Sequence, residues 1–383
     1  MTCPRLSLCT YTFNDAKFVH DLLAQVSSWQ VQPDEIVVVD DGSEKPFTPK
    51  EPLACLRVLR LGANQGITRA KGTGLSAARG ELIFSMDCDT RVAPDWLAVN
   101  LPNLTRPGVA LVGGALVHAA GADLVSRYLR AYGDNHNLHH VGEVDFIPGN
   151  AFLLRRSTWE EVGGFSAYAE TNCQDHYLSN LLRARGYSLY SDAAAKAWQT
   201  RRIRRATLCR RVWKWCHKAV KGQMLNGERT VPYLFEVAVK PMLERFVTSI
   251  ELGEMLFLYV DLLYMAHLVL DCLDYGVASG LTTDPVRAGF LRRLARLFEG
   301  YPELWRCFRA DLAACGHQVL MPAAGDEDVW TDFFLFSDML RHSGLFDWLE
   351  REGVGLLRLE AREESYDFSS YAQASFAMEP RRV

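Results

Sequence analysis

Short, mostly apolar runs alternate with helical patterns over the first 200 residues. The runs are rich in Val, Ile and Leu, and several are apolar on both faces. Strands of this kind are typical of a parallel sheet covered by helices. The alternation therefore predicts an α/β fold, with Asn14 as the cap of the first helix. The expected strands are 6–10, 35–39, 56–61 and 82–86, and the expected helices are 15–28 and 66–78.

The character of the sequence changes after residue 200. Residues 201–221 contain nine Lys or Arg and no acidic residue, and the pattern beyond residue 231 is helical throughout. We therefore predict an α/β domain over 1–205, a basic amphipathic connecting helix over 206–228 and a helical domain over 229–383.

The longest apolar stretch, 255–270, is interrupted by Asp261 and His267. Because a spanning helix needs about 20 mostly apolar residues, we expect a buried or amphipathic helix here. The N-terminus has no charged segment followed by a long apolar run, so no signal peptide is expected. The ten cysteines are scattered without a paired framework. They are expected to be reduced thiols of a cytoplasmic protein.

Composition is that of an ordinary globular protein, with 49% hydrophobic and 23% charged residues. The formal net charge of −4 lacks the basic excess of general nucleic-acid binders, so we expect no nucleic-acid partner.

Two of the expected strands end directly in acidic turns. Asp40 and Asp41 follow the second strand, and Asp87 and Asp89 follow the fourth. Ligands of open α/β sheets bind beyond the carboxyl ends of strands, so these four carboxylates should share one rim. Two carboxylates one residue apart can reach one hard cation such as Mg²⁺ or Mn²⁺ and leave its other positions to phosphates and water. A solvated turn is the alternative interpretation.

The ordered set of motifs resembles glycosyltransferase family 2, the inverting enzymes of the GT-A fold. The resemblance covers about residues 4–200. It implies a mostly parallel, Rossmann-like sheet with helices on both faces, followed here by an all-helical C-terminal region. The motifs are Tyr11-Thr12-Phe13-Asn14, Asp40-Asp41-Gly42-Ser43, Asn64-x-Gly66, Ala70-Lys71-Gly72-x-Gly74, Asp87-x-Asp89, Gly163-Gly164-Phe165 and Gln174-Asp175.

This resemblance also implies a role for each matching residue. Aromatic and polar residues after the first strand would shape the nucleobase pocket, and an acidic residue of the next turn would read the base. The implied assignments are Tyr11, Phe13 and Asn14 for the pocket, Asp41 for the base, Lys71 near the nucleotide, Asp87 near the ribose or metal, Asp89 as the metal ligand and Asp175 as the catalytic base.

The residues around Asp175 support that role independently. Residues 149–154 look like a strand, Ser157 is the expected N-cap of a helix over 158–162, and Asp175 begins another helix. An Asp at a helix start is often merely a cap. Inversion, however, requires a base on the side opposite the leaving group.

The chain departs from the family pattern at three positions. Gln174 stands where the family usually has Glu, Phe13 precedes Asn14 where Tyr is common, and Trp198 aligns with a His that ligates metal in some members. Residues His136, His139 and His140 are spaced to share one helical face. One of them could replace the missing ligand, whereas a surface or acceptor-pocket role is the preferred interpretation.

The basic segment over 207–221 has the spacing of an amphipathic helix. Leu208, Val212, Trp215 and Ala219 form its expected apolar stripe. Such a helix could make a peripheral contact with an anionic membrane. It could equally pack on the catalytic domain or present an ordinary solvated face.

Together these features predict an inverting, metal-dependent glycosyltransferase. The expected donor is a nucleotide-diphosphate sugar, with a UDP-sugar as first choice, and the acceptor is a growing glycan or a lipid-linked saccharide. A polysaccharide-synthesis enzyme of this kind is expected in the cytoplasm or at the inner face of the membrane. The alternative is a catalytically silent saccharide- or partner-binding module on the same fold, which Gln174 and Trp198 favour.

Overall fold

The computed structural model describes residues 5–118, 121–132 and 136–359, and the chain divides into two compact units. The first unit runs to Arg202 and is an α/β domain. The second begins at Ile203 and is helical, and Asp123–Val125 groups with it.

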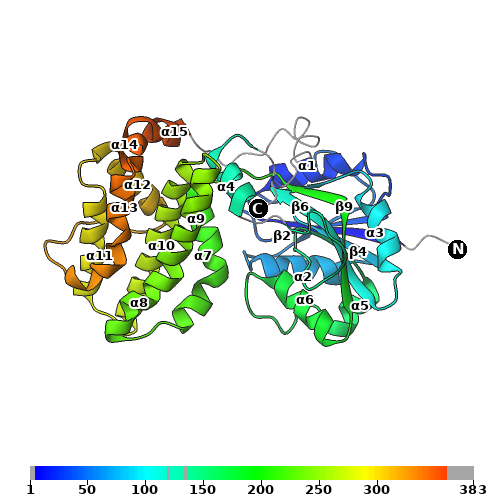
Figure 1. Ribbon diagram of the computed structural model, residues 1–383. Coiled ribbons are helices and arrows are strands. Elements are labelled where there is room, and N and C mark those ends of the chain that lie inside the picture. Colours follow the sequence, from blue (N-terminus) through cyan, green and yellow to red (C-terminus); the bar gives the residue numbers. More distant parts are fainter. Residues whose placement is uncertain (1–4, 119–120, 133–135, 360–383) are drawn as a thin grey trace. The chain divides into compact units, whose positions relative to one another are not determined.

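The first unit is built on a nine-stranded mixed sheet in the order β3-β2-β1-β4-β8-β6-β9-β5, with β7 paired to β9 (Figure 1). The run β3-β2-β1-β4 is parallel, as the apolar runs predicted. Strand β8 is antiparallel to β4 and β6, and β6 is parallel to β9. The strands are β1 (Leu6–Thr12), β2 (Glu35–Asp40), β3 (Leu56–Arg60), β4 (Leu82–Met86), β5 (Thr90–Val92), β6 (Val109–His118), β7 (Val141–Val144), β8 (Ala151–Arg155) and β9 (Ser188–Gln199).

Helices cover both faces of this sheet, which agrees with the predicted architecture (Figure 1). Apolar residues of α1 and α3 form a buried cluster with one set of strand side chains, and those of α2, α5 and α6 form a second cluster with the alternate set. Buried Phe84, on the first face, stacks on Trp96 with ring centroids 4.6 Å apart. The helices are α1 (Ala16–Val26), α2 (Ile67–Ala77), α3 (Trp96–Leu104), α4 (Leu124–Tyr132), α5 (Arg156–Val162) and α6 (Gln174–Ala184).

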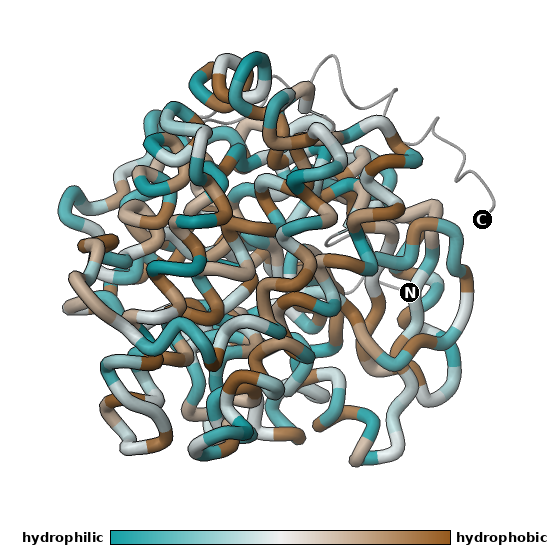
Figure 2. The backbone as a smooth tube through the Cα atoms, turned by 60° about the vertical axis from the view of Figure 1, so that its left-hand side comes forward, coloured by the Kyte–Doolittle hydropathy of each residue, from teal (hydrophilic) through white to brown (hydrophobic). Residues whose placement is uncertain are grey.

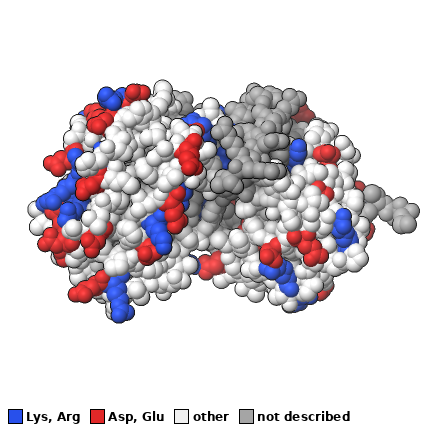
Figure 3. All heavy atoms as spheres, viewed as in Figure 1, with Lys and Arg blue, Asp and Glu red and all other residues white. Residues whose placement is uncertain are grey.

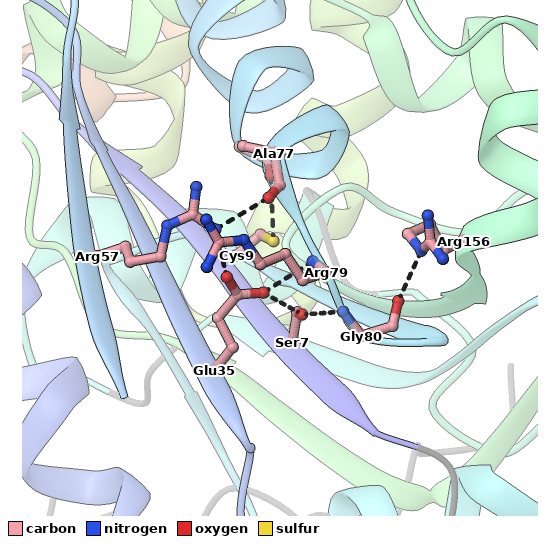
Figure 4. A network of polar contacts seen from close by, with 9 residues as sticks. Ser7, Cys9, Glu35, Arg57, Ala77, Arg79, Gly80 and Arg156 are labelled. Atoms are coloured by element: carbon pink, nitrogen blue, oxygen red, sulfur yellow. Dashed lines mark hydrogen bonds and ion pairs between the residues drawn. The ribbon is translucent and has the colours of Figure 1, made fainter. Parts of the chain in front are cut away.

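A polar network ties together the amino ends of the parallel strands (Figure 4). The buried Glu35 carboxylate accepts hydrogen bonds from the Ser7 hydroxyl at 2.6 Å and from the Arg79 backbone N–H at 2.8 Å, and it pairs with Arg57. Burial raises the pKa of Glu35, but these hydrogen bonds and the Arg57 charge outweigh it and leave the pKa lowered. The network therefore stabilises the sheet at the end opposite the acidic turns.

Two expected helix caps are wrong. Asn14 has a left-handed φ of 58°, and its side chain accepts a hydrogen bond from Glu44 N–H, so it joins the next turn and leaves Asp15 as N-cap. Ser157 lies inside α5, which begins at Arg156 directly after β8. The observed N-cap is one residue after Asn14 in the first case and two residues before Ser157 in the second.

The second unit is a set of helices around one long central helix, α10. Hydrophobic and hydrophilic positions alternate along most of these helices (Figure 2), and on the face in Figure 3 acidic and basic side chains are interspersed. The helices are α7 (Arg205–Gly222), α8 (Thr230–Leu234), α9 (Lys240–Glu251), α10 (Leu256–Ala278), α11 (Asp284–Leu297), α12 (Pro302–Ala314), α13 (Phe336–His342), α14 (Leu345–Trp348) and α15 (Val354–Leu359).

Helix α10 contains the apolar stretch that we expected to be buried, and it is buried. By length and composition it is the single described helix that could cross a membrane, yet 89% of its most apolar window lies inside the unit. Asp261 within it is fully buried and pairs with Arg245 at 2.7 Å. Helix α10 therefore forms the core of the second unit.

Helix α7 confirms the expected helix in the basic segment, but its buried stripe differs from the predicted one. Trp213 is buried and donates to Asp271 at 2.5 Å, whereas Trp215 is 42% exposed. The buried face is therefore offset by about a quarter turn from the predicted stripe. Leu208 belongs to both, but Cys209 and Trp213 are buried in place of Val212, Trp215 and Ala219.

Candidate active site

The three predicted acidic and aromatic turns meet at one edge of the sheet. Strand β1 lies between β2 and β4, with Thr12 opposite Asp40 and Cys9 opposite Ser85. Because all three strands are parallel, the segments that follow their carboxyl ends converge. The structure thus brings residues 11–14, 40–43 and 87–89 to a common rim.

Asp40 stabilises the turn that follows β2. It is almost fully buried and accepts hydrogen bonds from the backbone N–H groups of Ser43 and Phe47 and from Arg60. Burial raises its pKa, but these donors outweigh that effect and leave the pKa of Asp40 lowered. Asp40 therefore fixes the turn, because both of its carboxylate oxygens accept hydrogen bonds from within the protein.

Asp41 lies next to Asp40 and binds the two residues that precede α2. Its Oδ1 accepts from the Gln65 N–H at 2.8 Å and its Oδ2 from the Gly66 N–H at 2.9 Å. Each carboxylate oxygen has a second lone pair, so Asp41 can accept a further hydrogen bond from a base. The adjacent Gly42 has φ +74°, and a Cβ there would lie 2.5 Å from the backbone carbon of Ala63. The turn that presents Asp41 thus requires glycine.

Aromatic and polar residues at the carboxyl end of β1 and directly after it line the same rim. The Tyr11 hydroxyl lies 3.1 Å from Asp87 Oδ1, and burial together with the Asp87 charge raises the pKa of Tyr11 well above its ordinary value. Phe13 is 42% exposed, as a ring available to a base would be. The Asn14 side chain accepts from the Glu44 N–H, and the Asn14 N–H donates to the Ser43 hydroxyl, so Asn14 links the two turns.

Lys71 is the central cation of the site. Its ammonium is buried, lies 2.8 Å from Asp87 Oδ1, and donates to the Gly149 carbonyl at 2.7 Å. It also lies 5.4 Å from the centre of the Tyr11 ring. Burial and the nearby Asp89 raise the pKa of Asp87, against the lowering effect of Lys71.

Asp175 lies on the other side of the same glycine. Its Oδ2 accepts from the Gly149 N–H at 2.9 Å, and its Oδ1 accepts from the His176 N–H at 3.0 Å. A Cβ on Gly149 would come within 3.2 Å of the Asp175 side chain and 3.3 Å of the Lys71 ammonium. Gly149 therefore joins the candidate base to the candidate nucleotide site.

Asp89 is paired within the protein. Its Oδ2 lies 2.8 Å from Arg201 Nε, and the same guanidinium binds both oxygens of Asp15 at 2.7 and 3.2 Å. The Thr200 N–H and hydroxyl also donate to the Asp89 carbonyl at 2.8 Å. Arg201 and Asp15 were missed in the sequence, where Arg201 looked like part of the basic segment.

The predicted replacement ligands do not form the expected arrangement. Residues 136–140 are not helical, so the shared histidine face is wrong; Asn137 has a left-handed φ of 54°. His136 packs edge-on against Phe146, which stacks on exposed His176 at 4.0 Å. Trp198 is a buried residue of β9, opposite Arg91.

The oxygen donors of Asp87 and Asp89 nevertheless suit a divalent cation. Three carboxylates, including Asp15, face two cations, Lys71 and Arg201, so the rim retains negative charge. Among the described residues no group of three or more His, Cys, Asp or Glu could hold a metal. Mg²⁺ in such sites commonly takes one or two carboxylates and completes its shell with phosphate and water. The donor set therefore fits a cation that binds together with a diphosphate.

The model of a family described as glycosyl transferase family 2 matches residues 7–171. This part of the chain belongs to glycosyltransferase family 2. The mixed, largely parallel α/β sheet followed by a helical region is the architecture that the resemblance predicted.

Several relatives in this family are distant. Glycosyltransferase AglE of Haloferax volcanii is 25% identical over 198 residues, which cover 49% of this chain and 64% of that protein. The glucosyl-dolichyl phosphate glucuronosyltransferase of the same organism is 24% identical over 174 residues, which cover 41% of this chain and 54% of that protein. The chain thus spans less than two thirds of the length of these relatives.

Solved glycosyltransferase structures resemble the chain weakly. The mannosyltransferase PcManGT from Pyrobaculum calidifontis in complex with GDP-Man and Mn²⁺ is 19% identical, covers 82% of this chain and 86% of its own, and has a TM-score of 0.42. GalNAc-T7 with UDP, GalNAc and Mn²⁺ is 16% identical, with coverages of 51% and 43% and a TM-score of 0.42.

Proposed function

We propose that this protein is an inverting glycosyltransferase that moves a sugar, with a hexose as first choice, from a nucleotide-diphosphate donor to an acceptor hydroxyl. One observation carries the proposal. The Gly149 peptide binds Asp175 through its N–H and Lys71 through its carbonyl, and Lys71 in turn binds Asp87. The candidate base and the nucleotide rim are thus linked through the backbone of one residue.

Asp175 is the base in this mechanism. Its carboxylate takes the proton of the acceptor hydroxyl while the acceptor oxygen forms a bond to the anomeric carbon. The bond between that carbon and the donor phosphate oxygen breaks, and a nucleoside diphosphate leaves from the opposite face, so the configuration inverts. General-base catalysis of this kind contributes roughly 10²- to 10⁴-fold to a rate.

The nucleotide rim binds and orients the donor. Phe13 offers an exposed ring to the base, Asp41 offers carboxylate lone pairs to a base N–H, and Lys71 supplies positive charge close to the phosphates. Mg²⁺ or Mn²⁺ bound by Asp89 with Asp87 would neutralise charge on the departing diphosphate.

A UDP-sugar remains our first choice of donor. The proposal is tested by calorimetric titration of UDP and GDP with Mn²⁺, followed by a hydrolysis screen over a panel of sugar nucleotides. We expect one nucleotide to bind, and D41N to weaken it at least tenfold, because a charge-assisted hydrogen bond to the base is lost. E44Q is the matched control, since Glu44 lies exposed in the same turn. Absence of binding by both nucleotides would remove the proposal.

A saccharide or lipid-linked acceptor completes the proposal, with the enzyme at a cytoplasmic membrane surface. Helix α7 supports it through exposed Trp215, whose ring lies 5.4 Å from the Arg211 guanidinium carbon, and through exposed Lys214. Flotation with vesicles containing anionic lipid should recover the wild-type protein, and W215S/K214Q should float less.

A catalytically silent binding module is the second candidate. Gln174 in place of Glu and buried Trp198 in place of His favour it, because both departures lie at positions that the family pattern assigns to the reaction or the metal. This candidate predicts saccharide binding without donor hydrolysis, so the hydrolysis screen separates the two.

A further inference from the structure

The ion pair between Arg201 and Asp89 uses the carboxylate that a cation would need. Arg201 Nε and Asp89 Oδ2 are 2.8 Å apart, and the two residues are 112 positions apart in the chain. Asp89 is also held through its carbonyl by Thr200, the residue before Arg201. The contact is thus built into the end of β9 and is not a chance meeting of two surface side chains.

The Arg201 guanidinium is also held from its other sides. Asp15 binds both terminal nitrogens, and the guanidinium carbon lies 4.2 Å from the centre of the Phe18 ring. Burial lowers the pKa of Arg201, but Asp89 and Asp15 more than offset it and raise the pKa, so the group stays charged. Three of its five N–H donors are used in these contacts, and two remain for another acceptor.

We infer that Arg201 competes with the divalent cation for Asp89 and thereby couples cation binding to diphosphate binding; this inference rests on the proposed function. A cation that takes Asp89 must displace a guanidinium and then tolerate its positive charge nearby. Without nucleotide the displaced Arg201 retains Asp15 alone. When a diphosphate is bound, the N–H donors of the displaced Arg201 can bind its phosphate oxygens. The free-energy cost of displacing Arg201 from Asp89 is then smaller.

This competition has a reciprocal thermodynamic consequence. If the diphosphate eases cation binding, the cation must tighten diphosphate binding by the same factor. A positive charge that merely repelled the cation would weaken cation binding equally with and without nucleotide. Competition for Asp89 instead predicts that Arg201 weakens cation binding strongly in the free protein and only slightly in the nucleotide complex.

The test measures Mn²⁺ affinity without nucleotide by electron paramagnetic resonance, and UDP and GDP affinity by calorimetry in Mn²⁺ and in EDTA. R201Q removes the positive charge, and R201K keeps the charge but lacks the several N–H donors of a guanidinium. R185Q is the control, because it removes an exposed arginine at the C-terminal end of α6. We expect R201Q to bind Mn²⁺ alone at least tenfold more tightly than wild type. The ratio of nucleotide affinities in Mn²⁺ and EDTA should fall at least tenfold, with R201K intermediate and R185Q unchanged.

Two failures are distinguishable. If the nucleotide binds but R201Q leaves both Mn²⁺ affinity and the nucleotide ratio at the wild-type values, Arg201 does not compete for Asp89 and the proposed function stands. If neither nucleotide binds under any condition, the proposed function itself fails. Thermal unfolding of each folded variant confirms that the comparison is between native proteins, and R201K provides the comparison if R201Q does not fold.

Discussion

Lys71 and Asp175 bind the backbone carbonyl and the backbone N–H of Gly149, respectively. The Lys71 ammonium donates to the Gly149 carbonyl at 2.7 Å, and Asp175 accepts from the Gly149 N–H at 2.9 Å. A Cβ on Gly149 would lie within 3.3 Å of both side chains, so one of them would have to shift by a few tenths of an ångström. The position of the candidate base is therefore set by the same contacts that fix the nucleotide-side cation.

The Lys71–Asp87 pair should be strongly coupled. K71M leaves the Asp87 carboxylate without its cation in a mostly buried site, and we expect a loss of roughly 3 kcal/mol in the free energy of unfolding. D87N should also destabilise, since the buried Lys71 ammonium then loses its negatively charged partner. The double variant should lose less free energy of unfolding than the two single variants together, and the difference should be on the order of 1 kcal/mol or more. Urea unfolding of all four proteins measures this, and strict additivity would contradict the pairing.

Gly42 should be intolerant of substitution. Its left-handed φ and the 2.5 Å approach to Ala63 predict that G42A costs at least about 2 kcal/mol of stability and weakens nucleotide binding by disturbing Asp41. G62A is the matched control, because a Cβ at Gly62 meets nothing within 4 Å. Thermal unfolding and calorimetry compare the two variants. Equal effects of G42A and G62A would show that the turn is not constrained as described.

The buried histidine pair of the helical unit should make stability depend on pH. His267 Nδ1 lies 2.7 Å from His317 Nε2, and burial, reinforced by the charge of His317, lowers the pKa of His267 to about 4. Between this value and about 6.5 the unfolded chain binds a proton that the folded chain does not. The free energy of unfolding should therefore fall as the pH drops from 7 to 5, by about 2 kcal/mol from His267.

Urea unfolding at both pH values tests this expectation. H267Q should show a smaller loss between pH 7 and pH 5 than the wild type, whereas H342Q, at an exposed histidine, should retain the wild-type loss. An identical pH dependence in H267Q and the wild type would assign the acid sensitivity to other groups.

The parallel strands could be predicted because burial on both faces leaves continuous apolar runs in the sequence. The antiparallel insertion of β8 and the long pairing of β6 with β9 could not, because register between distant segments leaves no local pattern. The same limit applies to the site. Asp41 and Asp87 follow recognisable strand ends and Asp175 lies at a recognisable helix start, whereas the Arg201–Asp89 pair joins residues 112 positions apart.

Local signals also gave two errors at the site. Asn14 looks like a helix cap, but its left-handed backbone turns it toward Ser43 and Glu44. The three histidines at 136, 139 and 140 have helical spacing, but Asn137 adopts a left-handed φ and the segment is a turn. Spacing predicts a shared face only where the backbone is helical.

The central claim is that Asp175 removes the acceptor proton, and its most direct test is single-turnover transfer by D175N with the donor identified in the hydrolysis screen. We expect the rate to fall by roughly 10²-fold or more while donor affinity stays within about threefold, because the base acts in the transition state. D145N is the control, because Asp145 is exposed, pairs with Arg183 and lies four residues before Gly149. This variant should transfer at the wild-type rate. Transfer by D175N at the wild-type rate would contradict the account.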